Sequence, residues 1–223
     1  MRSSGKSLTR TTYEWPKRRS PGDDAFAPDV VLEERQFEQL LPAFAESGVG
    51  LGNTPYTELK LEASQIHIEV DGCLRLKPNQ RKSMRWLRTI LFEPFSQVVA
   101  FHDRDRDLLP EVATFLGRYA DRSVHVDTNE DGERVTTPAS DADEVVSIAG
   151  DSVAFGAGVG NEVTLASQMQ RRDMGLRYVN LGVGGARSAD ILCNLAAATN
   201  RYSGKIRRLI YVYCENDLEE YRA

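Results

Sequence analysis

Three short apolar segments at regular intervals in the last third of the chain constrain the fold most. These segments are residues 145–149, 178–181 and 208–214. Between them lie two segments with helical spacing, one expected to carry Val163, Leu165, Ala166 and Met169 on its inner side and one over 189–198. Strands that alternate with helices of this length predict βαβ units and a parallel sheet.

Three positions that directly follow these strands could support chemistry, namely Ser152, Gly185 and Asn216. In an open α/β sheet, ligands bind at the carboxyl ends of the strands. A serine that attacks an ester carbonyl creates a negative oxygen, and losing one donor to that oxygen costs on the order of 10²–10³ in rate. The backbone N–H groups of Ser152 and Gly185 and the side-chain amide of Asn216 could supply three such donors.

The residues around these positions resemble the SGNH, or GDSL, hydrolase family. The matching blocks are, in order, Gly150-Asp151-Ser152, Asn180-x-Gly182-x-x-Gly185 and Asn216-Asp217. The segment 127–135 is also similar to a lead-in that some family members carry. The resemblance covers residues 125–223 and implies a flavodoxin-like three-layer α/β/α sandwich whose first three strands have the order 2-1-3.

The resemblance also implies ester hydrolysis or acyl transfer on a small-molecule or carbohydrate acyl ester. It assigns Ser152 as the nucleophile through an acyl-enzyme, and Ser152, Gly185 and Asn216 as the oxyanion hole. The residues that it assigns to supporting roles are Asp151, Asn180 and Asp217. From its own position, Asp151 is expected to be a hydrogen-bonding turn residue.

Two departures from the family pattern concern the third block and the base. Cys214 stands where the family has a glycine, so we expect a small backbone adjustment there. The family's base is a histidine near the C-terminus with an aspartate three residues before it, but no histidine follows His125. We therefore expect the base to lie beyond Ala223, and this chain to be a truncated form that is itself nearly inactive.

Other histidines could replace that base. The candidates are His67, His102 and His125. Short alternating stretches explain His67 and His125 as half-buried strand positions, and the charge run 102–107 reads as a solvated face. Truncation would also leave 208–214 as an apolar edge strand that promotes aggregation, with Tyr211 and Tyr213 as packing residues.

The part of the chain before residue 145 is expected to be an extension. Residues 1–28 are basic and predict a disordered tail, and residues 29–144 predict mixed helices and short strands. Helical spacing indicates a helix over 32–46, which Pro42 would end early, and two further helices. Their apolar positions are Met84, Leu87 and Leu91 in one, and Leu108, Val112, Phe115, Leu116 and Tyr119 in the other. Alternation over 65–70, closed by Asp71-Gly72, predicts a strand and a turn.

Composition excludes several protein classes. The net charge of −5 argues against a nucleic-acid partner. The three cysteines lie far apart and form no CxxC pair, so neither a zinc site nor a disulfide framework is indicated. No apolar run approaches the ~18 residues of a membrane span, and no signal peptide is visible, so the default location is cytoplasmic. The oligomeric state stays open.

Two glycine-rich segments and one acidic segment are candidates for dinucleotide-binding and calcium-binding loops. The segments 156–160 and 182–187 do not fit the dinucleotide-binding spacing, and the first is better read as a flexible turn. Residues 127–132 imitate the start of a calcium loop, but Pro138 stands where the last ligand belongs, so a polar turn is predicted. No metal and no cofactor are expected. A non-catalytic SGNH-fold binding or scaffold protein and a nucleotide-binding α/β domain remain as alternatives.

Overall fold

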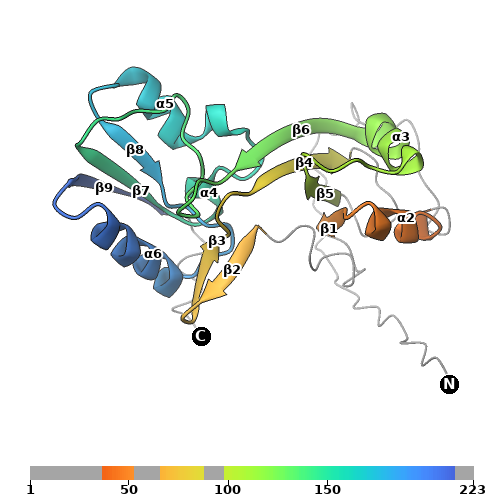
Figure 1. Cartoon of the computed structure of the whole chain (residues 1–223), viewed down its shortest axis with the longest axis horizontal. Helices are drawn as coiled ribbons and strands as arrows, with labels where there is room; N and C mark the ends of the chain where they lie inside the picture. The colour runs from red at the N-terminus through yellow and green to blue at the C-terminus, as the bar shows by residue number, and fades with distance from the viewer. Residues whose placement is uncertain (1–36, 53–65, 88–97, 214–223) are drawn as a thin grey trace, which may run out of the picture. The chain divides into compact units, whose positions relative to one another are not determined.

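The computed structural model describes residues 37–52, 66–87 and 98–213. The expected tail 1–28, Leu91 and the third block with Cys214, Asn216 and Asp217 lie outside these ranges. The chain forms two compact units, one of Met1–Ser64 with Met84–Ser123 and one of Gln65–Ser83 with Val124–Ala223. The second unit therefore adds residues 65–83 and 124–144 to the expected hydrolase segment 145–223. Figure 1 labels the elements of both units.

The first unit contains helices α2 (Leu41–Glu46) and α3 (Pro110–Tyr119) and a four-stranded sheet. The strand order is β1 (Gly50–Gly52), β5 (Val98–Asp103), β4 (Arg81–Leu87) and β6 (Ala120–Asp127), with β1 and β5 antiparallel. The unit boundaries fall within β4 and β6. The α3 helix confirms the helix expected around Val112 and Phe115.

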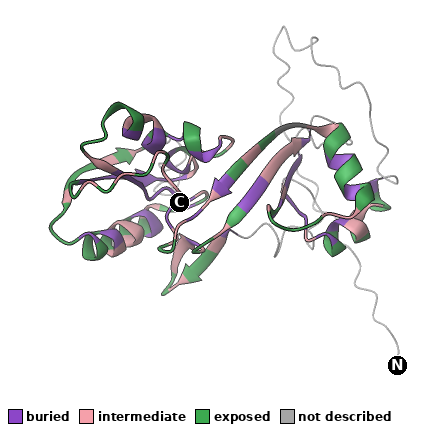
Figure 2. Ribbon diagram, turned by 45° about the horizontal axis from the view of Figure 1, so that its top comes forward, coloured by how far each residue is buried: buried purple, intermediate pink, exposed green. Residues whose placement is uncertain are grey.

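The core of the first unit is aromatic and aliphatic. The ring of Phe44 meets that of Phe115 edge-on at a centroid distance of 5.4 Å, and Phe37 packs against both. Val112 and Leu116 are fully buried beside them. Figure 2 shows the resulting division of α3 into buried and exposed faces. This division follows from apolar side chains that recur three and four residues apart along one helix.

Two expectations for this region are wrong. Pro42 lies in the first turn of α2, where a missing N–H costs nothing, and so it begins the helix instead of ending it. Met84 and Leu87 lie in strand β4, because pairing with β5 and β6 overrides their helical spacing. The charge run 102–107 is mostly exposed, as predicted, except for His102, which is buried at the end of β5.

The second unit begins with a β-hairpin formed by β2 (His67–Val70) and β3 (Cys73–Leu76). Val70 pairs with Cys73 across a two-residue turn. Asp71 and Gly72 both have positive φ, 53° and 74°, as the turn that matches the twist of a hairpin requires. The strand and turn predicted over 65–72 are therefore confirmed.

A parallel three-stranded sheet forms the centre of the second unit. Its order is β8 (Arg177–Asn180), β7 (Val145–Gly150), β9 (Ile206–Val212), which is the expected 2-1-3 arrangement. The helical segments are α4 (Ser152–Phe155), η3 (Asn161–Val163), α5 (Leu165–Arg172) and α6 (Ser188–Arg201). In Figure 1, α5 and α6 lie on different sides of this sheet. The described part of the chain is thus mixed α/β and includes a parallel three-stranded sheet.

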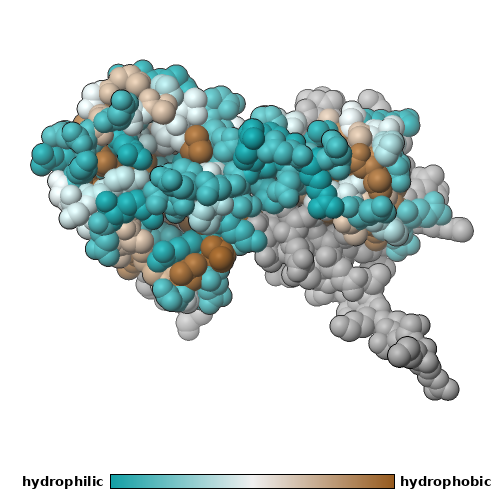
Figure 3. Space-filling view, viewed as in Figure 1, coloured by the Kyte–Doolittle hydropathy of each residue, from teal (hydrophilic) through white to brown (hydrophobic). Residues whose placement is uncertain are grey.

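The edge strand β9 is less covered than its neighbours. All six residues of β7 are buried, whereas Leu209 and Tyr211 on β9 are 47% and 46% exposed. The predicted edge position is confirmed, but the packing role expected for Tyr211 and Tyr213 is wrong, since both side chains are exposed. On the face drawn in Figure 3, hydrophobic residues form separate spots among hydrophilic ones.

The start of α5 corrects the predicted inner face of that helix. Ala166 is buried and Met169 partly buried, as expected, but Val163 and Leu165 are exposed. The reason is that η3 ends at Val163 and a new helix begins after Thr164, whose hydroxyl caps it by accepting from the N–H of Ser167. The two segments do not share one helical phase, so one periodicity cannot describe both.

Candidate functional site

The turn around Ser152 is built by close backbone contact. Strand β7 ends at Gly150, where an added Cβ would lie 2.5 Å from the carbonyl oxygen of Val212 on β9. The Asp151 carboxylate accepts from the N–H of Val153 at 3.0 Å and so caps α4. Asp151 is therefore the hydrogen-bonding turn residue that was predicted. These contacts fix Ser152 as the first residue of α4, at the carboxyl end of the strand.

Ser152 itself is partly exposed and weakly engaged. Its hydroxyl donates to Asp151 Oδ2 over a long 3.4 Å, and no other described residue bonds to its Oγ. Its backbone N–H has no acceptor in the described part of the chain. A serine hydroxyl is a weak nucleophile until a base takes its proton. In this arrangement Ser152 has an available N–H donor but no base in contact.

The loop after β8 runs beside the Ser152 turn. The N–H of Leu181 donates to Ile148 and the N–H of Val183 donates to Gly150, which extends the pairing of β8 with β7. A Cβ on Gly182 would lie 2.1 Å from the backbone nitrogen of Phe155, so only glycine lets this loop touch α4. The close approach holds the loop against the helix that begins at Ser152.

Gly185 lies at the open end of this loop. Its φ is +77°, and an added Cβ would meet nothing within 4 Å. No described residue accepts from its N–H. Gly185 and Ser152 therefore sit on loops that leave the same ends of the adjacent strands β8 and β7. Neither N–H has an acceptor among the described residues, and an oxyanion site requires such available donors.

The third block cannot be placed, because Asn216 and Asp217 lie outside the described residues. Asn180 is fully buried and has a structural contact, since its Oδ1 accepts from the N–H of Gly182 at 2.9 Å. Its Nδ2 is buried without a hydrogen-bond partner in the described structure. Asn180 thus bonds to the loop that carries Gly185, and the supporting role expected for it stays a prediction.

A residue that the motifs did not identify, Arg134, fastens the other end of α4. Its Nη1 donates to the carbonyl oxygens of Phe155 and Gly156, each at 2.7 Å, and its Nη2 donates to that of Val159. Its Nε donates to Asn161 Oδ1 at 3.3 Å. These bonds satisfy carbonyl groups that the C-terminal end of a helix leaves without donors.

The guanidinium of Arg134 is one of the most buried charged groups in the second unit. It is 1% exposed and lies 4.6 Å from the ring centroid of Phe155. Burial lowers its pKa to about 10, while the carboxylates of Glu162 and Asp127 act in the opposite direction, so it stays charged at neutral pH. Arg134 falls in the lead-in 127–135, which was the only sequence signal that could have found it.

The three histidines differ in their relation to this site. His67 Nε2 is buried without a partner, 3.9 Å from where a Cβ of Gly184 would lie. Burial, and to a smaller extent Lys77, lower the pKa of His67, so the ring is neutral at pH 7. His125 is exposed on β6, and His102 belongs to the other unit. None of the three bonds to Ser152 Oγ, whose contacts among described residues end with Asp151.

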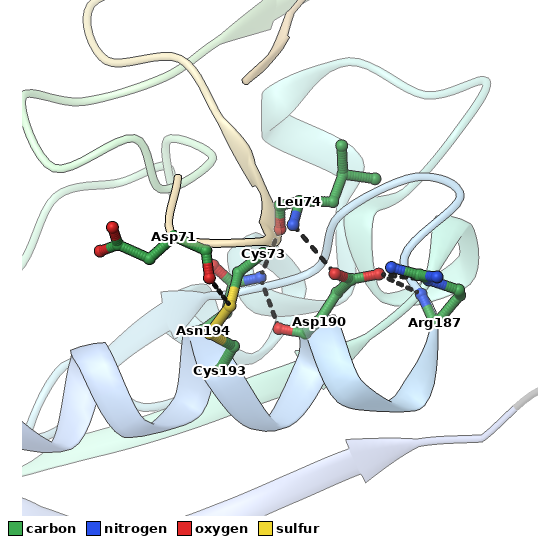
Figure 4. Close-up of a disulfide and its surroundings, with 7 residues drawn as sticks. All are labelled: Asp71, Cys73, Leu74, Arg187, Asp190, Cys193 and Asn194. Atoms are coloured by element: carbon green, nitrogen blue, oxygen red, sulfur yellow. Dashed lines mark hydrogen bonds and ion pairs between the residues drawn. A yellow bond between two sulfur atoms is a disulfide. The ribbon is translucent and has the colours of Figure 1, made fainter. Parts of the chain in front are cut away.

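A disulfide joins Cys73 on β3 to Cys193 on α6, across 120 residues of sequence. Figure 4 shows this bond beside Leu74, Asp190 and Asn194. The spacing of the cysteines indicated no disulfide framework, and the structure corrects this for one pair. Their separation concealed the pair, because only the docking of the hairpin on α6 brings the two sulfur atoms together.

The lead-in is a polar turn, as predicted. Asn129 Oδ1 accepts from the N–H groups of Asp131 and Glu133 at 3.0 and 2.8 Å. The Glu133 carboxylate accepts from the hydroxyl of Tyr202 and pairs with Arg201. In the ranges that the structure describes, no group of three or more His, Cys, Asp or Glu residues is arranged to hold a metal ion.

Comparisons with known proteins add no family assignment. The sequence matches no protein-family model and no curated protein. None of the helices in the described ranges combines the length and apolar character that a membrane crossing needs. The interpretation of the site therefore depends on its residues and their geometry.

Proposed function

We propose that this chain belongs to a serine esterase or acyl-ester hydrolase of the SGNH type, acting through an acyl-enzyme on Ser152. The observation that carries the proposal is the pair of unengaged N–H groups on Ser152 and Gly185, on loops from adjacent strands. A flavodoxin-like three-layer sandwich accounts for the strand order β8-β7-β9 and for helices on different sides of that sheet. Asn216 is proposed as the third donor.

In the proposed reaction, Ser152 Oγ attacks the acyl carbonyl carbon and its proton passes to a base. The carbonyl oxygen becomes an oxyanion held by the N–H groups of Ser152 and Gly185. Collapse expels the alcohol and leaves an ester on Ser152, and water then releases the acid. The cap from Asp151 and the carbonyl contacts of Arg134 support this proposal because they hold both ends of the short α4 helix.

The mechanism needs a base, and among the described residues no contact of Ser152 provides one. A non-catalytic binding protein with the same site is therefore a second candidate, favoured by the long 3.4 Å contact of Ser152 with Asp151 alone. The two proposals differ in one property. In an esterase site, Ser152 becomes a nucleophile once a base is available, whereas in a binding site it does not.

Chemical rescue separates the two. We expect the chain to hydrolyse p-nitrophenyl acetate barely above background, and added imidazole to raise a turnover that depends on Ser152. Ser152→Ala measures the reaction of imidazole with the ester alone. Ser147→Ala is the matched control, because Ser147 lies buried on β7, the strand that leads to Ser152, with an Oγ that bonds to no described residue. Equal imidazole rates for Ser152→Ala and the unmodified chain would favour the binding protein.

A further inference from the structure

The β2–β3 hairpin is attached to α6 by one covalent bond and two hydrogen bonds. The disulfide joins Cys73 to Cys193, the N–H of Leu74 donates to Asp190 Oδ1 at 2.9 Å, and Asn194 Nδ2 donates to the carbonyl oxygen of Leu74 at 2.9 Å. Figure 4 shows the three contacts side by side along the first turns of the helix. We call these contacts the clasp.

The clasp continues into the loop that carries Gly185. Asp190 Oδ2 accepts from the backbone N–H of Arg187 at 2.9 Å and from its Nε at 3.3 Å. Arg187 is the N-cap residue of α6 and directly ends loop 182–187. The buried carboxylate of Asp190 therefore bonds to the hairpin with one oxygen and to the end of the loop with the other (Figure 4).

The hairpin also lies close to the middle of this loop. His67, at the start of β2, has its Nε2 3.9 Å from the point that a Cβ added to Gly184 would occupy, but this nitrogen bonds to no described residue. The loop is thus tied to the hairpin at Arg187, through Asp190. Gly185 lies two residues before Arg187 and has no backbone hydrogen bond to a described residue. Its position depends on its neighbours.

We propose that the Cys73–Cys193 disulfide is a redox control on loop 182–187. The oxidised form keeps the hairpin docked and Arg187 tied to it through Asp190. The reduced form frees the hairpin and residues 184–187 of the loop, while Gly182 and Val183 stay against Phe155 and Gly150. A two-stranded hairpin is marginal by itself in water, so the two hydrogen bonds to α6 hold it only weakly once the covalent bond is gone. The consequence for catalysis rests on the proposed function, in which Gly185 donates to the oxyanion.

The chemistry of the switch is thiol–disulfide exchange with a dithiol reductant. One thiolate of the dithiol attacks a sulfur of the pair, which breaks the bond between Cys73 and Cys193 and forms a mixed disulfide. The second thiolate of the dithiol displaces the protein sulfur. Two electrons and two protons end on Cys73 and Cys193 as thiols, and the dithiol becomes a cyclic disulfide. Both cysteines are half-buried, so a small reductant has access to them.

Hydrogen exchange tests the proposal without requiring catalysis. The full chain carries Cys214→Ser, so that Cys73 and Cys193 are its only thiols, and is compared with and without dithiothreitol. We expect amides in 67–76 and 184–188 to exchange at least ~10-fold faster after reduction, because these segments then open locally without the covalent bond. Amides of α3, in the other unit, serve as the internal reference.

A double variant, Cys73→Ser with Cys193→Ser, controls for direct effects of the reductant. It should exchange rapidly in both conditions and keep the circular dichroism of the reduced parent. Unchanged protection of 184–188 after verified reduction would overturn the proposal, as would rapid exchange in both redox states of the parent.

The outcome for the proposed function is read separately, from Ser152-dependent imidazole rescue in each redox state. Faster exchange with a rescue rate at least ~10-fold lower supports both proposals, by analogy with the loss of one oxyanion donor. Faster exchange without any Ser152-dependent rate in either state supports the clasp and contradicts the esterase. Unchanged exchange, with a Ser152-dependent imidazole rate that is the same in both redox states, supports the esterase and contradicts the redox control by the clasp.

Discussion

The two units of this chain are stabilised in different ways. The first has a core of Phe37, Phe44 and Phe115 with aliphatic neighbours, and the contacts within this core are apolar. The second surrounds its Ser152 turn with buried polar groups, among them Arg134 and Asp190. Apolar packing tolerates small shifts, whereas a buried hydrogen-bond network needs every partner in place. The candidate site is therefore held mainly by hydrogen bonds, whereas the core of the first unit is held mainly by close packing of apolar side chains.

The largest expected effect is the removal of Arg134. Replacing it with methionine deprives three carbonyl oxygens and one amide oxygen of a donor, each worth ~1–3 kcal/mol when buried. We expect the free energy of unfolding of the second unit to fall by about 4–5 kcal/mol, measured by urea titration. Arg207→Met is the control, because its pair with Glu144 is exposed and worth at most about 1 kcal/mol. If the two substitutions lowered the free energy of unfolding equally, the buried hydrogen bonds of Arg134 would not be what stabilises the second unit.

Phe44→Ala tests the apolar unit. Phe44 is fully buried among its neighbours. Its truncation should therefore lower the free energy of unfolding by about 3–4 kcal/mol, through lost apolar burial and the cavity left behind. We expect amide exchange to accelerate in α3 and β5 and to stay unchanged around Ser152. A comparable loss of protection in α4 would mean that the units do not unfold separately.

We expect Asp190→Asn to lower the free energy of unfolding by about 1–3 kcal/mol at pH 7, since the buried charge-assisted hydrogen bonds to Leu74 and Arg187 are weakened. Burial acts to raise the pKa of Asp190, but the N–H of Leu74 and the groups of Arg187 outweigh it, and the pKa lies below its usual value. The stabilisation is therefore complete above the unfolded pKa and is lost as pH falls through the folded pKa. Asparagine removes that pH dependence.

Urea midpoints between neutral and acid pH measure this effect. The parent should lose more stability than Asp190→Asn over the acid range, so the two curves converge at low pH. Asp141→Asn, at an exposed position before β7, is the matched control and should follow the parent. Parallel curves for the parent and Asp190→Asn would show that the carboxylate charge does not stabilise the clasp.

The smallest expected effect is a gain in the stability of the first unit. Gly117 lies inside α3, and a Cβ added there meets nothing within 4 Å. Gly117→Ala should raise stability by ~0.5–1 kcal/mol, because alanine loses less conformational freedom in a helix. The melting temperature of the unit containing α3 reports the gain. A loss instead would indicate that a residue outside the described ranges packs on this face.

Local patterns were sufficient for much of the second unit. The apolar runs ending at Gly150 and Asn180 predicted adjacent parallel strands, because buried strands must be apolar on both faces. Asp71-Gly72 predicted the hairpin turn, since its positive φ values are a property of two neighbouring residues. The Gly-Asp-Ser turn was likewise readable. The roles assigned to Ser152 and Gly185, and to Asn216 and Asp217 beyond the described residues, stay predictions.

By itself, the sequence determined the elements whose cause is local: the parallel strands, the hairpin turn and the cap of α4 by Asp151. Only the tertiary structure decided that Met84 lies in a strand, that Arg134 fastens α4 and that Cys73 meets Cys193. Each of these depends on partners that other parts of the chain supply, 120 residues away for the disulfide. Periodicity records the neighbours of a residue in sequence, whereas burial and bonding depend on its neighbours in space.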